Sequence, residues 1–148
     1  MLIMMNDIQH FKALENMYLA APVNEYYQPK IKVSDSESEI SIELKNSMHH
    51  SAGAVHGSVY FKLMDDSAFF AANSLEKEFF VLTSSFTTYL LKPVIDGELK
   101  AIGKVVSKTR SQWIVESVVY NSDLEVARGS GVFVRGKYLL NQAKGYSI

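Results

Sequence analysis

A stretch without proline that favours a long helix, residues 57–75, most constrains what this chain can fold into. The stretch is rich in Phe, Leu, Met and Ala, and from Val59 to Ala72 it is apolar on nearly all sides. A helix that is apolar all round is unstable when any side of it faces water, so it is normally buried. We therefore expect the rest of the chain to enclose this helix.

The flanking residues have the patterns of a short helix and of β-strands. Apolar residues recur at helical spacing over residues 7–20 and Pro22 follows them, which predicts a short amphipathic N-terminal helix. Apolar and polar residues alternate on both sides of the polar tip 34–38, which predicts a hairpin, and residues 46–55 are typical of a loop. Four strands in antiparallel series are predicted after the central helix, over residues 79–91, 99–108, 113–120 and 124–135.

A sheet of these strands has to curl around the single helix to cover its accessible sides. Ala127, Gly129 and Gly131 share one face of the last predicted strand, and such small side chains would let a helix or another backbone approach closely. The expected fold class is α+β, with a curved antiparallel sheet wrapped around one long central helix and a short N-terminal helix. The 148 residues fit one domain, divided into the N-terminal helix, residues 1–22, and the core, residues 23–148.

Composition excludes several classes of function. Fifteen basic and sixteen acidic residues give a net charge of −1, without the basic excess that nucleic-acid or membrane-surface binding requires. The chain has no cysteine, which excludes disulfides, thiolate nucleophiles and cysteine-based metal sites. The apolar start, residues 1–5, is too short for a signal peptide, and no stretch reaches the roughly 18 apolar residues of a membrane span. We therefore expect a cytoplasmic protein.

Two adjacent acidic residues, Asp65 and Asp66, interrupt the apolar helix. Aspartate is a poor helix former, and burying its charge without a partner is costly. One interpretation is that one of the two points to solvent or caps a loop. The other is that a carboxylate lies in a cleft as a general base or nucleophile, with a pKa set by its surroundings. Successive helical residues point about 100° apart, so only one of them can face a cleft.

Gly57, at the start of the helix, could supply the matching electrophilic group. The first N–H groups of a helix lack partners and carry its positive dipole end, so they can hold an oxyanion, and glycine lets a carbonyl group come close. Gly57 and Asp65 are eight residues apart, about 12 Å along a helix, so one carbonyl group cannot reach both. A site that uses both must be shared by two subunits, as in a two-fold dimer with antiparallel helices.

Residues 56–65, His-Gly-Ser-Val-Tyr-Phe-Lys-Leu-Met-Asp, resemble the motif G-x-x-HGG-x-x-x-x-L-x-D-x-A of the hotdog thioesterases related to the phenylacetate-degradation enzymes. The similarity extends over about residues 40–135, through Thr83, the segment 89–93 with Gly97 after it, and residues 127–129. The resemblance implies the hotdog fold and hydrolysis of acyl-CoA without a metal or organic cofactor. It also implies a homodimer, and a homotetramer built as a dimer of dimers.

The resemblance also implies roles for individual residues. Asp65, nine positions after the motif histidine, falls on the catalytic carboxylate, and Gly57 falls on the residue that donates the oxyanion N–H. His56 is expected to orient the loop or the substrate. Thr83, ten positions before Pro93, is expected to assist the attacking water.

Three positions depart from the motif, and all three are expected to contact substrate. The second glycine of the motif is Ser58 here, and an asparagine six residues before the motif histidine is His50. The L-x-D part of the motif selects Asp65, whereas the D-x-A part selects Asp66. The spacing from His56 favours Asp65 as the catalytic residue and leaves Asp66 as a substrate-binding position.

Other interpretations of the polar residues have less support. His49, His50, His56 and an aspartate could bind a metal, but clustered histidines in a loop favour other loop roles. Ser58 and Ser67 lack the G-x-S-x-G context of a serine nucleophile, and residues 129–131 are not a dinucleotide fingerprint. The main rival is a non-catalytic acyl-CoA-binding or regulatory hotdog domain. A hotdog hydratase is disfavoured, because the chain lacks the histidine-centred motif with prolines of that class.

For two further sets of residues the sequence is compatible with either a structural or a substrate-binding role. The pairs Phe69-Phe70 and Phe79-Phe80 belong to the core or line an acyl tunnel. Five basic residues are solvated strand ends or hold the phosphates of coenzyme A: Lys92, Lys108, Arg110, Arg128 and Arg135.

Overall fold

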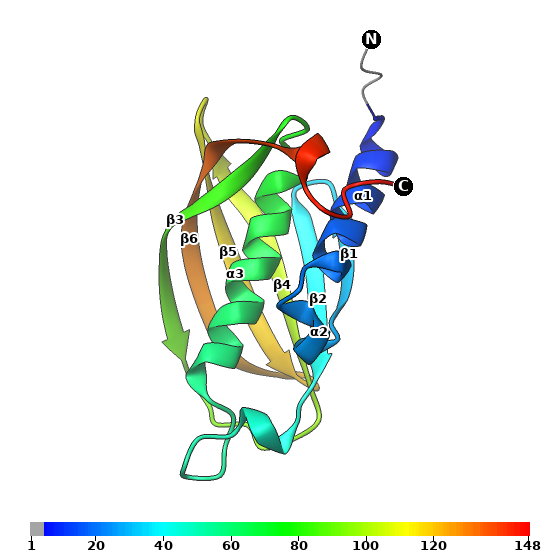
Figure 1. Ribbon diagram of the computed structural model, residues 1–148. Helices are drawn as coiled ribbons and strands as arrows, with labels where there is room; N and C mark the ends of the chain where they lie inside the picture. The colour runs from blue at the N-terminus through cyan, green and yellow to red at the C-terminus, as the bar shows by residue number, and fades with distance from the viewer. Residues whose placement is uncertain (1–4) are drawn as a thin grey trace.

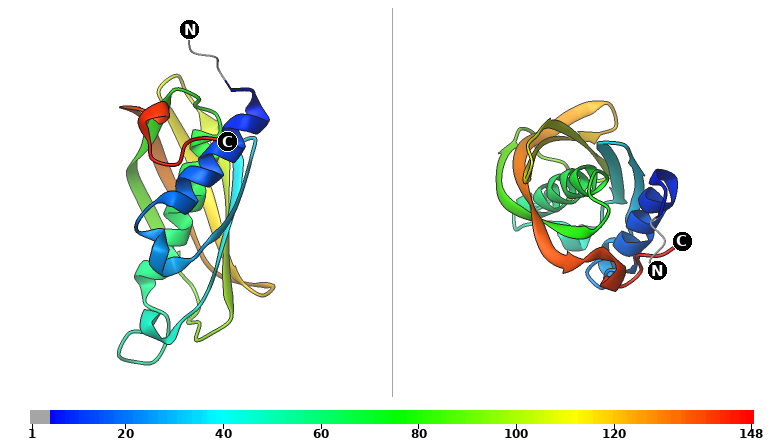
Figure 2. Two further views of the ribbon diagram at one scale, coloured as in Figure 1. Left: turned by 45° about the vertical axis from the view of Figure 1, so that its right-hand side comes forward. Right: turned by 90° about the horizontal axis from the view of Figure 1, so that it is seen from above.

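The predicted apolar helix is α3, Gly57–Asn73, in the computed structural model of the chain. Seen from above, the sheet curls around α3 (Figure 2). In Figure 1 the sheet passes behind α3, and the front of the helix lies between β3 and α1. The structure describes residues 5–148, so most of the apolar start 1–5, where no signal peptide was expected, lies outside the described residues.

The predicted curved antiparallel sheet is confirmed in the part of the chain that the structure describes. Its six strands follow the order β1-β2-β4-β5-β6-β3, and all neighbouring pairs are antiparallel. The strands are β1 Lys30–Ser34, β2 Glu37–Glu43, β3 Phe79–Leu90, β4 Glu98–Lys108, β5 Gln112–Asn121 and β6 Leu124–Leu139.

One connection differs from the predicted antiparallel series. β3 pairs with β6 at the far edge of the sheet, and β4 pairs with β2 instead. The reason is coverage of α3: with the β1–β2 hairpin at one edge, β3 has to reach the opposite edge if the sheet is to flank the helix on both sides. Local alternation predicts each strand but says nothing about which strand lies beside it.

The predicted N-terminal helix is confirmed as α1, Asp7–Ala20. Its first turn is stabilised by a capping box, in which the Gln9 N–H donates to the Asn6 side chain at 2.8 Å and the Asn6 N–H to the Gln9 side chain at 3.0 Å. A four-residue helix that was not predicted, α2, Asn24–Tyr27, follows after a short turn. Helix α1 also covers the free edge of β1, where the Val33 N–H donates to the Glu15 carboxylate at 2.9 Å.

A row of small residues crosses the sheet beneath the middle of α3. Ser38, Gly103, Ser117 and Gly129 are paired neighbours on β2, β4, β5 and β6. The Ser38 hydroxyl donates to the Ser67 carbonyl at 2.7 Å, and the Ser67 and Ser117 hydroxyls are hydrogen-bonded at 2.7 Å. A Cβ at Gly103 would lie within 3.0 Å of the Ser67 carbonyl group. This row therefore lets α3 lie unusually close to the sheet.

The sequence pattern predicted a close approach by a helix or another backbone on the last strand, β6, and not on β4. At Gly129 and Gly131 the space is taken by the Phe86 ring of β3, not by a helix. Of the two expected partners, a helix or another backbone, it is the backbone that comes close: a Cβ at Gly129 would lie 2.6 Å from the Thr87 carbonyl oxygen of β3, while α3 approaches β4 at Gly103.

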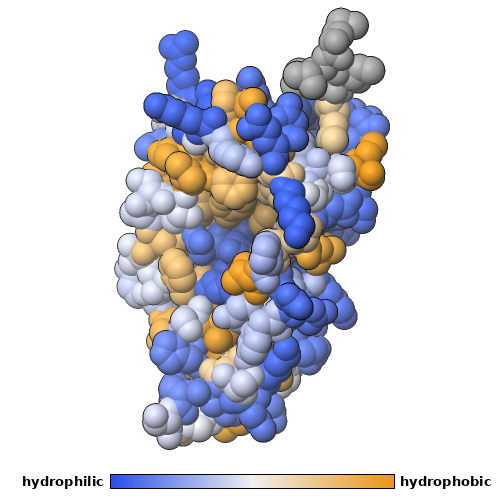
Figure 3. All heavy atoms as spheres, in the orientation of Figure 1, coloured by the Kyte–Doolittle hydropathy of each residue, from blue (hydrophilic) through white to orange (hydrophobic). Residues whose placement is uncertain are grey.

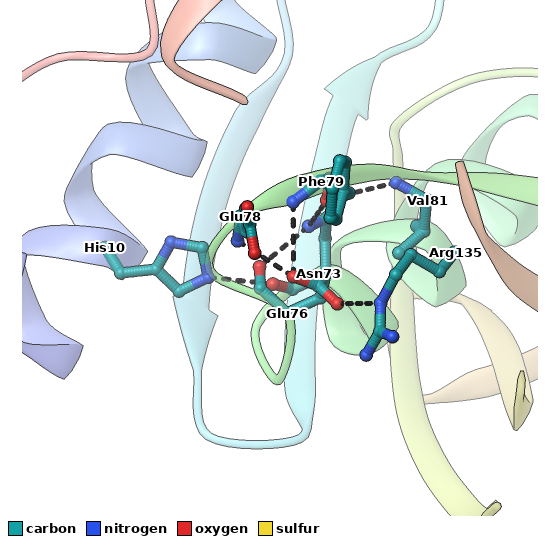
Figure 4. A network of polar contacts seen from close by, with 7 residues as sticks. All are labelled: His10, Asn73, Glu76, Glu78, Phe79, Val81 and Arg135. Carbon is teal, nitrogen blue, oxygen red and sulfur yellow. Dashed lines mark hydrogen bonds and ion pairs between the residues drawn. The ribbon is translucent and has the colours of Figure 1, made fainter. Parts of the chain in front are cut away.

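The end of α3 and the start of β3 are held by a polar network (Figure 4). The Asn73 side chain donates to the carbonyl groups of Glu76 and Phe79 and accepts from the Val81 N–H. Buried His10 of α1 bonds the Asn73 carbonyl through Nε2 at 2.8 Å. A carbonyl only accepts, so Nε2 carries the proton, and Nδ1 accepts from the Tyr146 hydroxyl at 2.7 Å. The Glu76 carboxylate accepts from two N–H groups and pairs with Arg135.

The predicted boundaries hold to within a few residues. Helix α3 ends at Asn73, the hairpin tip is only residues 35–36, and β6 runs past residue 135 to Leu139. Two 3-10 helices, Asn46–Met48 and Leu140–Gln142, complete the elements. Within residues 5–148 no helix is long and apolar enough to cross a membrane. The predicted single-domain organisation stays a prediction.

Gly103→Ala tests the close contact between helix and sheet. We expect it to lower the free energy of unfolding by about 1–3 kcal/mol, because the added methyl group pushes on backbone that cannot move aside. Chemical denaturation measures this. Lys104→Ala, an exposed change on the other face of β4, should stay within about 0.5 kcal/mol of the wild type. Equal denaturation midpoints for the two variants would contradict a tight contact between α3 and the sheet at Gly103.

Candidate active site

Asp65 and Thr83 come together from α3 and β3. The Thr83 hydroxyl donates to Oδ1 of Asp65 at 2.8 Å. Asp65 is half-buried and Thr83 is exposed, so the pair lies where the interior meets solvent. The structure thus places two of the four predicted catalytic residues in direct contact.

The surroundings of Asp65 pull its pKa in opposite directions. Burial raises the pKa of its carboxyl above the ordinary value, and the negative charge of Asp66 adds to that. The Thr83 hydrogen bond and the positive charge of Lys62 lower it, but the net effect is a raised pKa. A carboxylate with a raised pKa is a stronger proton acceptor than a solvated one, which suits general-base work.

Asp66 faces a different set of partners. Its Oδ2 accepts from the Tyr18 hydroxyl and from Nζ of Lys62, both at 2.7 Å. The Lys62 ammonium also lies over the rings of Tyr18 and Tyr27. Asp66 is therefore engaged in tying α1 to α3, whereas Asp65 has one side-chain partner and keeps Oδ2 free of hydrogen bonds within the described residues. This difference supports Asp65 as the reactive carboxylate.

A mostly apolar pocket of about 320 Å³ opens beside Asp65. Figure 3 shows apolar side chains gathered on this face of the molecule, between β3 and α1, around a smaller polar area. Phe69, Phe70 and Phe80, which were left open between core and acyl tunnel, line the pocket. The remaining lining residues are Met17, Tyr18, Ala21, Val23, Asn24, Lys62, Asp65, Asp66, Val81, Leu82 and Thr83.

Gly57 lies at the other end of the site, at the first residue of α3. Its N–H has no hydrogen-bond partner among the described residues, and a Cβ there would come within 3.0 Å of the Leu90 side chain. A second pocket, of about 300 Å³, is lined by Gly57 together with His50, Leu90 and Lys92, and with Val55, Tyr60, Leu91 and Pro93. The structure thus brings the predicted His50 beside Gly57.

His56 caps the same helix start. Its Nδ1 accepts from the Ser58 N–H at 3.1 Å and from the Ser58 hydroxyl at 2.7 Å. Nδ1 is thus an acceptor, so the proton is on Nε2, which is free to donate outward. The Ser58 N–H is taken by this cap, so of the two neighbouring N–H groups only that of Gly57 is free for a ligand.

The two pockets have no lining residue in common. Asp65 and Thr83 line one, and Gly57 and His50 line the other. Within one copy of the chain Asp65, Thr83 and Gly57 therefore form two half-sites, and the fourth predicted catalytic residue, His56, lines neither of these pockets.

The histidines and basic residues weighed for other roles have various surroundings, and His49 lines a third pocket together with His56. His49 bonds the Ile95 carbonyl, and the Nδ1 of His50 accepts from the Ala52 N–H. No group of three or more metal-ligating side chains is found within residues 5–148. Arg128 and Arg135 are paired with Glu125 and Glu76, while Lys92 lines the Gly57 pocket. Lys108 and Arg110 make no ion pair in the described chain.

Residues 52–127, just over half of the chain, match the family model described as the thioesterase superfamily. The chain belongs to the thioesterase superfamily. The matched range contains His56, Gly57, Asp65 and Thr83, but neither His50 nor any of α1 and α2.

Individual relatives of this thioesterase-superfamily chain agree with that result. A Sulfurisphaera tokodaii protein named "Putative esterase" is 27% identical over 104 residues, which cover 69% of this chain and 77% of that protein. The structure of the E. coli PaaI protein, from the phenylacetic acid degradation operon, superposes with a TM-score of 0.79 at 20% identity. It covers 88% of this chain and 98% of PaaI. Conserved protein PA5202 from Pseudomonas aeruginosa gives 0.74 at 24% identity, over 78% and 94% of the two chains. These similarities confirm the hotdog fold.

Sequence reasoning missed some pocket residues of this thioesterase-superfamily chain, both outside the matched residues 52–127 and, for Lys62, within them. Tyr18 and the α1–α2 turn were not expected near Asp65, because nothing local in residues 17–24 indicates a pocket wall. Lys62 could have been found, since its i,i+4 spacing to Asp66 on a helix favours an ion pair.

Two substitutions should move the pKa of Asp65 in opposite directions. Thr83→Val removes a hydrogen bond to the charged form, so the pKa should rise. Asp66→Asn removes a nearby negative charge, so the pKa should fall. Carboxyl ¹³C NMR of labelled aspartate, followed against pH, measures both. Shifts in the same direction would contradict the electrostatic account.

Proposed function

We propose that this protein hydrolyses acyl-CoA thioesters at a site shared by two copies of the chain. The observation that carries the proposal is the Asp65–Thr83 pair at the mouth of an apolar pocket, with the unpaired N–H of Gly57 in a separate half-site. Thioesterase-superfamily membership supports the reaction class.

Sharing of the site between two copies is supported by the free edge of β3 and by the exposed apolar side chains beside it. β3 has a single strand neighbour, β6, so one of its edges has no strand partner in the described chain. Large apolar side chains beside it are about half exposed, at 42% for Phe61, 51% for Leu82 and 53% for Leu90. A second copy, added through β3 about a two-fold axis, would cover them and bring its own Gly57 toward Asp65.

In the proposed reaction the thioester carbonyl oxygen accepts the Gly57 N–H. Asp65 of the other subunit takes a proton from a water held by Thr83, and the water oxygen attacks the carbonyl carbon. The tetrahedral oxyanion is stabilised at the helix start, where such a donor contributes about 3 kcal/mol. The C–S bond then breaks, giving the carboxylic acid, and coenzyme A leaves as the thiolate and is protonated. Direct attack by Asp65, with later hydrolysis of the anhydride, uses the same groups.

A non-catalytic acyl-CoA-binding role is the second candidate. It is favoured by His50, which stands where the motif has an asparagine, and by Ser58, whose N–H is already bonded to His56. His50 lines the Gly57 half-site, which would orient the carbonyl group, and Ser58 follows Gly57 in the helix but lines a different pocket. A cytoplasmic location, pairing of dimers into tetramers and substrate contacts of His50, Ser58 and Asp66 stay predictions.

Asp65→Asn should lower kcat by about 10²–10⁴-fold, because the general base is lost while the shape is kept. Thiol release from short, medium and aromatic acyl-CoAs measures this. Asp66→Asn is the matched control and should retain turnover, since its carboxylate faces Tyr18 and Lys62. The reverse pattern would overturn the assignment, and binding without thiol release by the wild type would favour the non-catalytic role.

A shared site predicts complementation between two inactive variants. Gly57→Val should be inactive, because a branched side chain at this position keeps the substrate carbonyl group from approaching the N–H closely. Co-expressed with Asp65→Asn, it forms mixed dimers in which one of the two sites has an intact Gly57 and an intact Asp65. About a quarter of wild-type activity should return. Activity no higher than that of the separate variants would exclude sharing.

A further inference from the structure

The wall of the Asp65 pocket opposite the sheet comes from the turn between α1 and α2, here defined as residues 17–24. Met17, Tyr18, Ala21, Val23 and Asn24 line the pocket from this side. The aromatic side chains of α3 and β3 line the other side. The pocket therefore lies between a catalytic helix and a turn that is distant from it in the sequence.

The α1–α2 turn is held firmly against α3. The Tyr18 hydroxyl donates to Asp66, and the Tyr18 ring packs edge-on against Phe70 with the centroids 5.0 Å apart. The Asn24 side chain donates to the Tyr18 carbonyl at 2.7 Å, and the Asn24 N–H to the Ala21 carbonyl at 2.9 Å. The turn is thus bonded internally at Asn24 and anchored to α3 through Tyr18, and both restrain it from moving outward for a larger ligand.

The character of the pocket limits what it can hold. Its volume of about 320 Å³ is at the small end of the range for ligand sites. Its cation, Lys62, is already paired with Asp66 at 2.7 Å, so no free positive charge is available for a carboxylate on the ligand. The shape and charge therefore fit a compact, uncharged acyl group.

We propose that the α1–α2 turn determines acyl-group size, so that its pocket-lining residues set the largest acyl group the site hydrolyses: Met17, Tyr18, Ala21, Val23 and Asn24. This inference rests on the proposed function. It is supported by the division of the pocket: Asp65 and Thr83 lie within the family-matched residues 52–127, whereas the α1–α2 turn lies outside them. The reacting groups thus lie within the family-matched residues, and the proposed size limit lies in residues that the family model does not match.

The test adds bulk to the wall. Ala21→Leu, and separately Val23→Phe at an exposed position that tolerates change, are compared with Leu19→Phe, which adds bulk at an exposed position of the same segment that does not line the pocket. The measured quantity is the ratio of kcat/KM for the longest straight-chain acyl-CoA that the wild type accepts to that for acetyl-CoA. Each wall variant should lower this ratio about tenfold or more, and the control should leave it unchanged. If Ala21→Leu does not fold, Val23→Phe decides.

Binding separates failure of this inference from failure of the proposed function. Calorimetry with S-alkyl coenzyme A thioethers, which have no carbonyl group, measures the same size limit without turnover. A wild type that hydrolyses acyl-CoAs while all variants keep its size ratio would overturn the role of the turn alone. A wild type that binds but does not hydrolyse, with wall variants that lose only the longer thioethers, would retain the role of the turn and overturn the hydrolase. No binding of any thioether would overturn both.

Discussion

The close approach of α3 to the sheet at Gly103 decides which way each acidic side chain of the helix points. Ser67 lies on the sheet side, bonded to Ser38 and Ser117. Asp65 is two residues earlier, about 200° around the helix, so it faces the open front between β3 and α1. Asp66, about 100° from either, faces α1 and Tyr18. A bulkier residue at 103 would push the helix outward and disturb all three directions together.

The two neighbouring carboxylates consequently have different surroundings although they are adjacent in sequence. Asp66 is neutralised by Lys62 and by the Tyr18 hydroxyl, so its charge is compensated within the fold. Asp65 has only a neutral hydroxyl donor and is half-buried, so its charged form is less stable and its pKa is raised. The fold thus gives two adjacent carboxylates different partners by a rotation of one residue along the helix.

Periodicity was enough to predict most elements, because a buried helix and half-buried strands impose different spacings on apolar residues. The resemblance selected Asp65 and Thr83 as catalytic residues, which the structure brings into contact, and the rise of a helix predicted the separation of Gly57 from Asp65. The place of β3 at the far edge, and the contact of Tyr18 with a residue 48 positions away, could not be predicted in this way. Both depend on which surfaces meet after the sheet has curled, and the pattern of apolar residues in one sequence does not show which surfaces meet.

The two edges of the sheet differ in a way that bears on assembly. The β1 edge is blocked by α1, with the Glu15 carboxylate occupying the Val33 N–H, while the β3 edge has no covering element in the described chain. Each copy of the described chain therefore has one sheet edge, that of β3, which is open to pairing with another strand. Once two copies join through β3, the continuous sheet ends in a blocked strand at both extremities, so it cannot elongate into a filament. The N-terminal helix thus limits strand-by-strand polymerisation as well as closing the pocket.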